Sequence, residues 1–218
     1  MIAIQIAEKV FSHLYKFLKP GISEKDVAKK IRYYLKHHGA KKESFKIIVA
    51  SGMRSALIHG FASSRKIKKN EIVMLDFGAL HKGYRSDITR TFVLGKPDSK
   101  QKKIYQILRR AQKAAIGKIK AGASCKIVDR AARKVIERAG YGKNFIHSTG
   151  HGIWYKTHEP PRIHHQSCDC LEEGNVITIE PGIYINKWGG MRIEDMVLVT
   201  KNGCKILTKA PHVLEFKS

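Results

Sequence analysis

The sequence predicts an α+β fold made of two similar halves, each with two helices followed by strands. The first reason is an internal echo. Lys19–Ser23 (KPGIS) is matched by Lys120–Ser124 (KAGAS), and Gly39 is matched by Gly140, all at one constant offset. The second reason is that helical spacing of apolar residues gives way in each half to short apolar runs that suit strands. Two similar sheets can then meet about a pseudo-dyad, with the functional site between the halves.

The helices follow from apolar residues that recur every three or four positions in segments 24–38 and 125–139. This is the spacing of a helix with one face turned to a core. We also expect an amphipathic helix at Met1–Glu8, because this stretch has no basic leader and no cleavage-site pattern. Serines and glycines of the echo suit helix ends. The predicted N-caps are Ser23 and Ser124, and the predicted C-terminal stops are Gly39 and Gly140.

Two apolar runs that each end in an acid predict strands. The run 72–75 leads into Asp76, and the run 176–179 leads into Glu180. In both halves the acid is followed two residues later by glycine, and then by an arginine placed two residues before another acid. These second acids are Asp87 and Glu194.

Carboxylates at the ends of buried strands are costly unless something neutralises them. Oxygen ligands with a single imidazole suit one or two divalent first-row metal ions, and a carboxylate can bridge a metal pair. The residues that we expect to form this cluster are Asp76, Asp87, His151, Glu180 and Glu194.

The composition suits one compact domain. The chain has 218 residues, of which 43% are hydrophobic, enough for a sizeable core in a single unit over 1–218. The halves, roughly 1–97 and 98–218, meet at a short loop around Gly95–Ser99. No apolar run approaches membrane-spanning length. We therefore expect a soluble, cytoplasmic protein that uses no membrane, in which the four cysteines are reduced thiols with structural or incidental roles. They are Cys125, Cys168, Cys170 and Cys204.

The formal net charge of +24 would usually suggest nucleic acid or another polyanion as partner. Lysine supplies 30 of the 42 basic residues, however, and these lysines are spread along the chain. No aromatic residues are interleaved with them in the way that stacks bases. We therefore expect a solvated, lysine-rich surface rather than a nucleic-acid interface. His37, His38, His164 and His165 lie in polar stretches and are expected at this surface.

Seven motifs give the chain a family resemblance over essentially its whole length. They lie at 51–59, 75–78, 86–92, 147–152, 158–160, 179–182 and 192–195. It resembles the pita-bread metallopeptidases (the creatinase/aminopeptidase superfamily), closest to the catalytic domain of Xaa-Pro dipeptidases (prolidases) and Xaa-Pro aminopeptidases. The sequence Arg192-Ile193-Glu194-Asp195 is typical of this Xaa-Pro-cleaving branch. The resemblance implies two pseudo-symmetric α-α-β halves, with a curved antiparallel sheet that encloses a dinuclear metal site.

The resemblance implies a role for each ligand. Asp76 would chelate one metal ion, His151 and Glu180 would bind the other, and Asp87 and Glu194 would bridge the two. Mn²⁺ is the ion that we expect first, and Co²⁺, Fe²⁺ and Zn²⁺ stay open because all of them accept oxygen and nitrogen ligands.

The resemblance also implies catalytic and substrate-binding residues. A metal-bridging hydroxide would attack the scissile carbonyl, and Glu180 would accept the proton of the bridging water. His59 and His158 would border the substrate and stabilise the tetrahedral intermediate. His147 would line the proline side of the pocket, and Arg192 would orient the substrate or a bridging ligand.

Two departures from the family pattern bear on the substrate. In the family, Gly-His-Gly is followed by an aliphatic residue and then by a glycine, and Trp154 stands in place of that glycine. We expect it to border the substrate pocket and to narrow it, cover it or alter its backbone. The additional amino-terminal domain of many Xaa-Pro peptidases is expected to be absent, because Met1 begins almost directly in the catalytic domain.

The expected function is hydrolysis of the bond between an N-terminal residue and proline by a dinuclear metallopeptidase. The expected substrate is a dipeptide or short peptide with proline at the second position, and a homodimer stays open. Methionine aminopeptidase is one alternative, although Arg192–Asp195 disfavours it. A pita-bread module that binds a partner without catalysis is another, and the positive charge offers it some support.

Overall fold

The computed structural model describes residues 2–216 of the chain, and its first half has the expected order of two helices followed by strands. The elements of this half are α1 (Ile2–Phe17), α2 (Glu24–His37), β1 (Lys42–Glu43), β2 (Ile48–Ser51), the 3-10 helix η1 (Gly52–Ala56), β3 (Ile72–Phe77), β4 (Ala79–His81), β5 (Tyr84–Arg85) and β6 (Ile88–Leu94).

The second half repeats this order, so the echo in the sequence corresponds to a repeated arrangement of elements. They are α3 (Ser99–Ile116), α4 (Cys125–Arg138), the 3-10 helix η2 (Gly142–Asn144), β7 (Gly150–Gly152), β8 (Glu159–Ile163), β9 (Val176–Ile179), β10 (Gly182–Ile185), β11 (Gly189–Arg192), β12 (Asp195–Thr200), β13 (Gly203–Ile206) and β14 (Glu215–Phe216).

The helix ends follow local sequence signals. Ser23 caps α2, since its hydroxyl accepts a hydrogen bond from the Asp26 amide at 3.1 Å. Ser124 occupies the corresponding N-cap position of α4, but its side chain makes no capping hydrogen bond. Gly39 and Gly140 follow the two helices with φ of +95° and +85°, a backbone conformation that favours glycine. The predicted stops are therefore confirmed.

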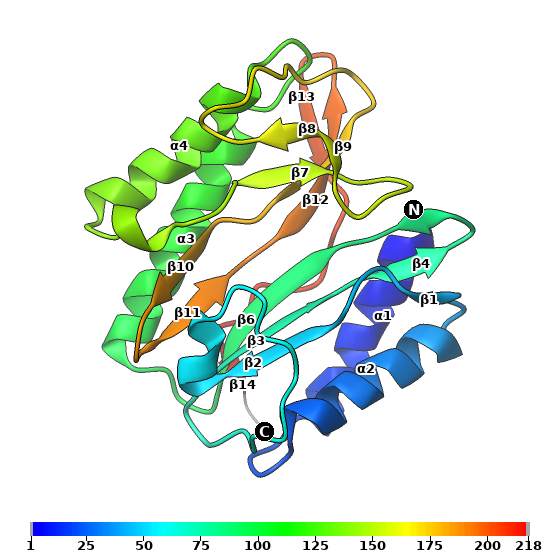
Figure 1. The fold of residues 1–218 in the computed structure, drawn as a ribbon, viewed down its shortest axis with the longest axis vertical. Coiled ribbons are helices and arrows are strands. Elements are labelled where there is room, and N and C mark those ends of the chain that lie inside the picture. The colour runs from blue at the N-terminus through cyan, green and yellow to red at the C-terminus, as the bar shows by residue number, and fades with distance from the viewer. Residues whose placement is uncertain (1, 217–218) are drawn as a thin grey trace.

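The strands lie between two helical layers. In Figure 1, α1 and α2 lie on one side of the strands, and α3 and α4 lie on the other. The first half contributes the sheet β14-β6-β3-β2 and the small sheet β1-β4-β5, and the second contributes β13-β12-β9-β7-β8 and β10-β11. Within these four sheets the pairs are antiparallel except β14 with β6, which is parallel. Strand β14 of the second half therefore completes a sheet of the first.

Each half supplies most of one large apolar core cluster. One cluster of buried side chains joins α1 and α2 to β3 and β6, with Val10, Leu14 and Ile31 among them. The other joins α3 and α4 to β9 and β12, with Leu108 and Val128 among them. No helix among residues 2–216 is both long and apolar enough to cross a membrane.

Backbone and side-chain hydrogen bonds join the halves along β6. The amide of Glu194 donates to the carbonyl of Thr89 at 3.1 Å. The hydroxyl of Thr91 donates to the carbonyl of Arg192 at 2.7 Å and accepts from its amide at 3.1 Å. The segment between β11 and β12 is thereby fixed against β6, and the strand ends of both halves meet at this seam.

Candidate metal centre

A cavity of about 660 Å³ opens at the seam between the halves. Its walls come from both halves, as the pseudo-dyad interpretation requires. The predicted site residues in its lining are Asp76, Asp87, His151, Glu180, Glu194, His59, His147, His158 and Arg192. The fold therefore brings together every predicted site residue except Trp154.

The five expected ligands come from five places along the chain. Asp76 lies near the end of β3, and Asp87 directly precedes β6. His151 is the middle residue of β7, Glu180 directly follows β9, and Glu194 lies between β11 and β12. Because strands of both halves end or turn at the seam, side chains that are far apart in the sequence converge there.

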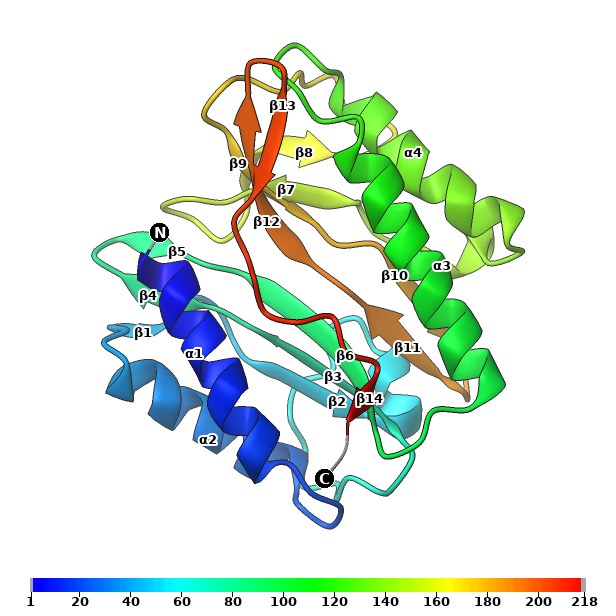
Figure 2. The same ribbon diagram turned by 180° about the vertical axis from the view of Figure 1, so that it is seen from behind.

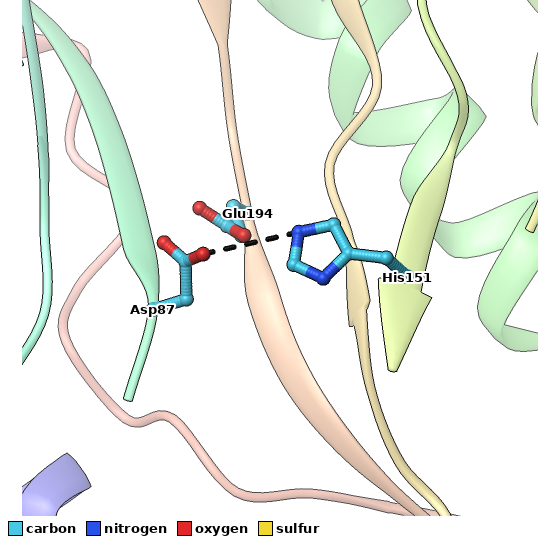
Figure 3. A group of neighbouring side chains, drawn as sticks. All are labelled: Asp87, His151 and Glu194. Carbon is cyan, nitrogen blue, oxygen red and sulfur yellow. Dashed lines mark ion pairs between the residues drawn. The ribbon is translucent and has the colours of Figure 1, made fainter. Parts of the chain in front are cut away.

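Three of these ligands form a tight group. One ligand atom each from Asp87, His151 and Glu194 lies within 4.8 Å of the others, and all three residues are buried. Figure 3 shows the carboxylates and the imidazole pointing toward one another from three separate segments. The His151 Nε2 atom lies 3.9 Å from Asp87 Oδ2 and 3.2 Å from Glu180 Oε1. His151 therefore connects the tight group to Glu180.

Arg192 lies on the other side of the group and holds Asp76. Its guanidinium forms an ion pair with the Asp76 carboxylate and lies 3.8 Å from Glu180 Oε2. It also donates to the Thr89 hydroxyl at 3.1 Å and to the Tyr184 hydroxyl at 2.7 Å. Arg192 is thus a fixed part of the wall, with its donors already engaged by the protein.

The site has more negative charge than its own residues balance. Burial, with the charges of Glu180 and Asp76, raises the pKa of Glu194 to about 8. Burial and the charge of Glu194 likewise raise the pKa of Asp87 well above its ordinary value. Burial alone would raise the pKa of Glu180, but the hydrogen bond and charge of His151 lower it to about 2. A cation at the seam would relieve this imbalance.

The residues present fit divalent metal ions. Asp76 Oδ1 and Glu194 Oε1 are buried and have no hydrogen-bond partner among the described residues. Buried carboxylate oxygens without partners are costly, and coordination to a cation satisfies them. Four carboxylates and one imidazole are hard and intermediate ligands of the type that Mn²⁺, Fe²⁺, Co²⁺ and Zn²⁺ accept.

A buried acid at the start of α2 holds the loop that carries His59. Glu24 is fully buried and accepts from the amide and hydroxyl of Ser51, both at 2.8 Å. It also accepts from the amide and hydroxyl of Ser63 at 3.0 and 2.6 Å, and from Arg54 at 3.2 Å. Because these partners lie on both sides of His59 in the sequence, Glu24 fixes both ends of its loop.

A buried acid on α4 does the same for the loop that carries His147. Asp129 is fully buried, accepts from the amide and hydroxyl of Thr149, and binds the guanidinium of Arg133 through both oxygens. Arg133 also donates to the carbonyl of His147 at 3.0 Å. The carbonyl of Thr149 in turn accepts from the amide of Glu180 at 2.7 Å. Both halves therefore support their cavity histidine with an acid from the second helix.

Several site residues carry no signal that sequence reasoning detected. Tyr184 is buried, and its hydroxyl lies 3.0 Å from His147 Nε2 as well as binding Arg192. Lys46 and Arg162 line the cavity and add cations to it. A lone tyrosine or arginine in a strand, or a lone lysine in a loop, has no distinctive spacing, so only the fold could place these three residues.

Trp154 does not line the cavity. Its side chain is 40% exposed and packs edge-on against Tyr84, with ring centroids 5.0 Å apart. His37, His38, His164 and His165 are exposed or half-buried, away from the cavity lining. The four cysteines are free thiols, of which only Cys125 is buried.

Comparison with known proteins places these features in a family context. The model of metallopeptidase family M24 matches residues 1–201. The Xaa-Pro dipeptidase of Pyrococcus furiosus is 49% identical over 212 residues, which are 97% of this chain and 61% of that protein. The Xaa-Pro dipeptidase of Pyrococcus horikoshii is also 49% identical, covering 97% of this chain and 60% of that protein. The chain thus spans about three-fifths of these relatives' length.

Solved structures show the same fold. The Xaa-Pro dipeptidase from Bacillus anthracis superposes with a TM-score of 0.96 at 47% identity, covering 98% of this chain and 60% of that one. Prolidase from Pyrococcus furiosus gives a TM-score of 0.94 at 49% identity, covering 96% and 62%. These likenesses confirm the predicted pita-bread fold.

Without divalent cations, the protein should lose stability as the pH rises. The pKa of Glu194 is raised from 4.5 to about 8 in the folded state, so the folded state holds this proton more tightly than the unfolded state. The stabilisation is complete below about pH 4.5 and is lost as the pH rises through about 8. Chemical unfolding midpoints between pH 5 and 9, with EDTA or with saturating Mn²⁺, measure it. Mn²⁺ and the substitution Glu194→Gln should each flatten the profile, and a level EDTA profile in the wild type would contradict the prediction.

Glu24→Gln should destabilise the protein, because glutamine cannot accept all the hydrogen bonds that the buried carboxylate accepts. Hydrogen bonds to charged groups contribute about 1.5–3 kcal/mol each, so we expect a loss of about 2 kcal/mol in the free energy of unfolding. Glu43→Gln is the matched control, since the ion pair of Glu43 with Arg32 lies at the surface and should contribute below about 1 kcal/mol. Equal losses in the two variants would show that Glu24 does not hold the loop.

Proposed function

Because the chain belongs to metallopeptidase family M24, we propose that it hydrolyses the bond between an N-terminal residue and proline, as a metal-dependent exopeptidase. The observation that carries this proposal is the convergence of Asp76, Asp87, His151, Glu180 and Glu194 on one cavity at the seam. The names of the two Pyrococcus relatives support the Xaa-Pro substrate class.

The proposed metal centre holds two divalent ions, with Mn²⁺ as the first candidate. Asp76 would serve one ion, His151 and Glu180 the other, and Asp87 and Glu194 both. The ions would acidify a bound water and polarise the scissile carbonyl. The unpartnered oxygens of Asp76 and Glu194 support this assignment, because each has a free lone pair that faces no donor of the described chain.

Glu180 is the proposed proton acceptor. With His151 as its donor, its pKa is held at about 2, so the carboxylate is ionised at neutral pH. An imidazole that binds a metal through Nε2 cannot donate from that atom. Metal binding by His151 therefore removes the hydrogen bond that weakens Glu180 as a base. The carboxylate can then take the water proton and pass it to the leaving nitrogen.

Three histidines are proposed to contact the substrate. His158 lies beside His151, with ring centroids 4.3 Å apart, and His59 lines the same cavity. Both can donate a hydrogen bond to the oxygen on which negative charge develops during attack. His147 is held by Tyr184, and burial lowers its pKa to about 4, so it is neutral at neutral pH. A neutral ring at this position suits the apolar proline side of the substrate.

The cavity also contains groups that suit a dipeptide. Arg162 and Lys46 line it, and no ion pair joins either side chain to an acid among residues 2–216. Lys46 lies over the ring of Phe61, with its ammonium 3.9 Å from the ring centroid. A cation near the metal ligands can bind the carboxylate that a dipeptide places one residue after the scissile bond. Arg162 is the better candidate, since its planar fork binds both oxygens.

A homodimer remains a prediction.

Substrate choice tests the proposal directly. Purified protein loaded with Mn²⁺ should hydrolyse Xaa-Pro dipeptides or short Xaa-Pro peptides with a higher kcat/KM than Met-Ala peptides. Metal analysis of the same preparation should give two ions per chain. A preference for Met-Ala would favour a methionine aminopeptidase instead. No hydrolysis of either peptide by the fully loaded protein would favour the non-catalytic binding module.

Arg162→Ala should weaken the binding of dipeptides more than the binding of longer peptides. Loss of a charge-assisted pair corresponds to about 1.5–3 kcal/mol, so KM for an Xaa-Pro dipeptide should rise at least about tenfold. For an Xaa-Pro tripeptide, whose carboxylate lies one residue further along, KM should change little. Arg130→Ala on α4, outside the cavity lining, is the control for the loss of one positive charge. Equal effects on both substrate lengths would exclude Arg162 as the carboxylate-binding residue.

Glu180→Gln and His158→Ala separate the proton acceptor from a residue that binds no metal. A proton-transfer group contributes about 10²–10⁴-fold to the rate, so Glu180→Gln should lower kcat by at least about 10²-fold. His158→Ala should lower kcat while metal content stays at the wild-type level. Stopped assays together with metal analysis of each variant measure both effects. Full activity in both variants would show that the site has been assigned wrongly.

A further inference from the structure

A second cavity, of about 470 Å³, lies between α3 and the segment that follows β13. Both elements can be followed in Figure 2, where the molecule is seen from behind. This cavity shares no lining residue with the cavity at the seam. Four of its lining side chains are cationic, and we call it the basic cavity. They are Arg109, Arg110 and Lys113 from α3, and Lys209 from the segment after β13.

The positive charge of the basic cavity is not balanced by the protein. Asp195 is the only carboxylate in the lining, and donors already surround it. Its oxygens accept from Arg90 at 2.8 Å, Thr208 at 2.6 Å, Gln112 at 3.0 Å and His212 at 2.9 Å. Among residues 2–216, no ion pair joins any of the four cations to an acid. Glu8 lies near Lys209 but accepts from its backbone amide. A concave surface with several unpaired cations attracts anions.

Two further side chains of the basic cavity, His212 and Arg109, differ in what they offer an anion. The Nε2 atom of His212 donates to Asp195, so the buried Nδ1 atom of the neutral ring, which has no hydrogen-bond partner among the described residues, is an acceptor and does not bind an anion. Arg109 donates through one nitrogen to the neutral side chain of Gln112 at 3.0 Å. An anion in the basic cavity can therefore bind the four cations without first breaking an ion pair to a carboxylate.

We propose that the basic cavity binds the phosphate group of a small organic phosphate. Arginine and lysine bind phosphate through short charge-assisted hydrogen bonds, and several cations together favour a dianion over a monoanion. Part of the remaining wall is apolar, with Ile116, Ile206 and Pro211 among its residues. Ile206 is 46% exposed, so it offers free surface for the organic part of the ligand.

Gln112 in the lining of the basic cavity is hydrogen-bonded to the neighbours of two proposed metal ligands. Gln112 donates to the carbonyl of Ile179, the residue before Glu180, at 3.2 Å and also to Asp195, the residue after Glu194. An anion that draws Arg109 away from Gln112 therefore acts on a side chain that holds both segments. Such coupling is reciprocal, so metal loading should also change the affinity for the anion.

Calorimetry with three probes tests the proposal. The probes are AMP, inorganic phosphate and adenosine, titrated into Mn²⁺-loaded protein at constant ionic strength. AMP should bind more tightly than inorganic phosphate, because it also covers the apolar wall, and adenosine should not bind measurably. The double variant Arg110→Ala/Lys113→Ala should lower the affinity for AMP by about tenfold or more. The control Arg130→Ala/Lys134→Ala removes an equal number of positive charges from α4. It should lower the affinity for AMP by at most about twofold.

Each contrary result has a distinct meaning. Equal weakening in both double variants would show unspecific attraction to a basic protein and would overturn the proposal. So would a lack of saturable binding to the wild type, or binding of adenosine as tight as that of AMP. Asp87→Asn separates the two cavities, since it alters a proposed metal ligand. If AMP binding were lost in Asp87→Asn but kept in Arg110→Ala/Lys113→Ala, AMP would be binding at the seam, and the basic cavity would not be its site.

Discussion

The structure depends on a set of carboxylates that are buried together at a seam. Asp76, Asp87 and Glu194 are almost completely buried, and Glu180 lies beside them. Their repulsion has to be offset by positive charge, and Arg192 supplies only part of it. Neither half holds the full set, because Asp76 and Asp87 come from one half and the other ligands from the second. The fold therefore has to keep both halves in register, which the bonds between β6 and the segment before β12 achieve.

Much of this arrangement can be predicted from the sequence. Some signals depend only on residues that are close in the sequence, so they can be recognised without a structure. These are the helical spacing of apolar residues, the repeated glycines and the apolar runs that end in an acid. The lining of the seam cavity by Asp76, Asp87, His151, Glu180 and Glu194 was predicted as well, while their role as metal ligands stays a prediction. Tyr184, Glu24 and Asp129 were not, because Arg192, Ser63 and Thr149, which they bind, lie 8, 39 and 20 residues away. Arg162 was not, because a lone arginine in a strand has no distinctive spacing. Trp154 was placed at the pocket by its motif position, but its ring packs on Tyr84, a neighbour 70 residues earlier in the chain.

Part of the negative charge of the chain lies in its interior. The chain has only 18 acids against 42 basic residues, and at least six acids are buried. These six hold loops, join the halves or face the cavity, so they are not available to pair with surface lysines. They are Glu24, Asp76, Asp87, Asp129, Glu194 and Asp195. A lysine-rich surface therefore accompanies an acidic interior, and net charge alone is a poor guide to the partner of this protein.

The pairing of β14 with β6 has a consequence during synthesis. Residues 215–216 complete a sheet whose other strands end by residue 94, so more than a hundred residues separate β6 from its partner. While the ribosome makes the second half, β6 presents an unpaired edge, and such edges pair readily with other chains. The first half can collapse early around α1 and α2, but it becomes a closed unit only when the last strand arrives. Nascent chains that still lack both the segment before β12, which bonds Thr89 and Thr91, and β14 should therefore expose the most of this edge.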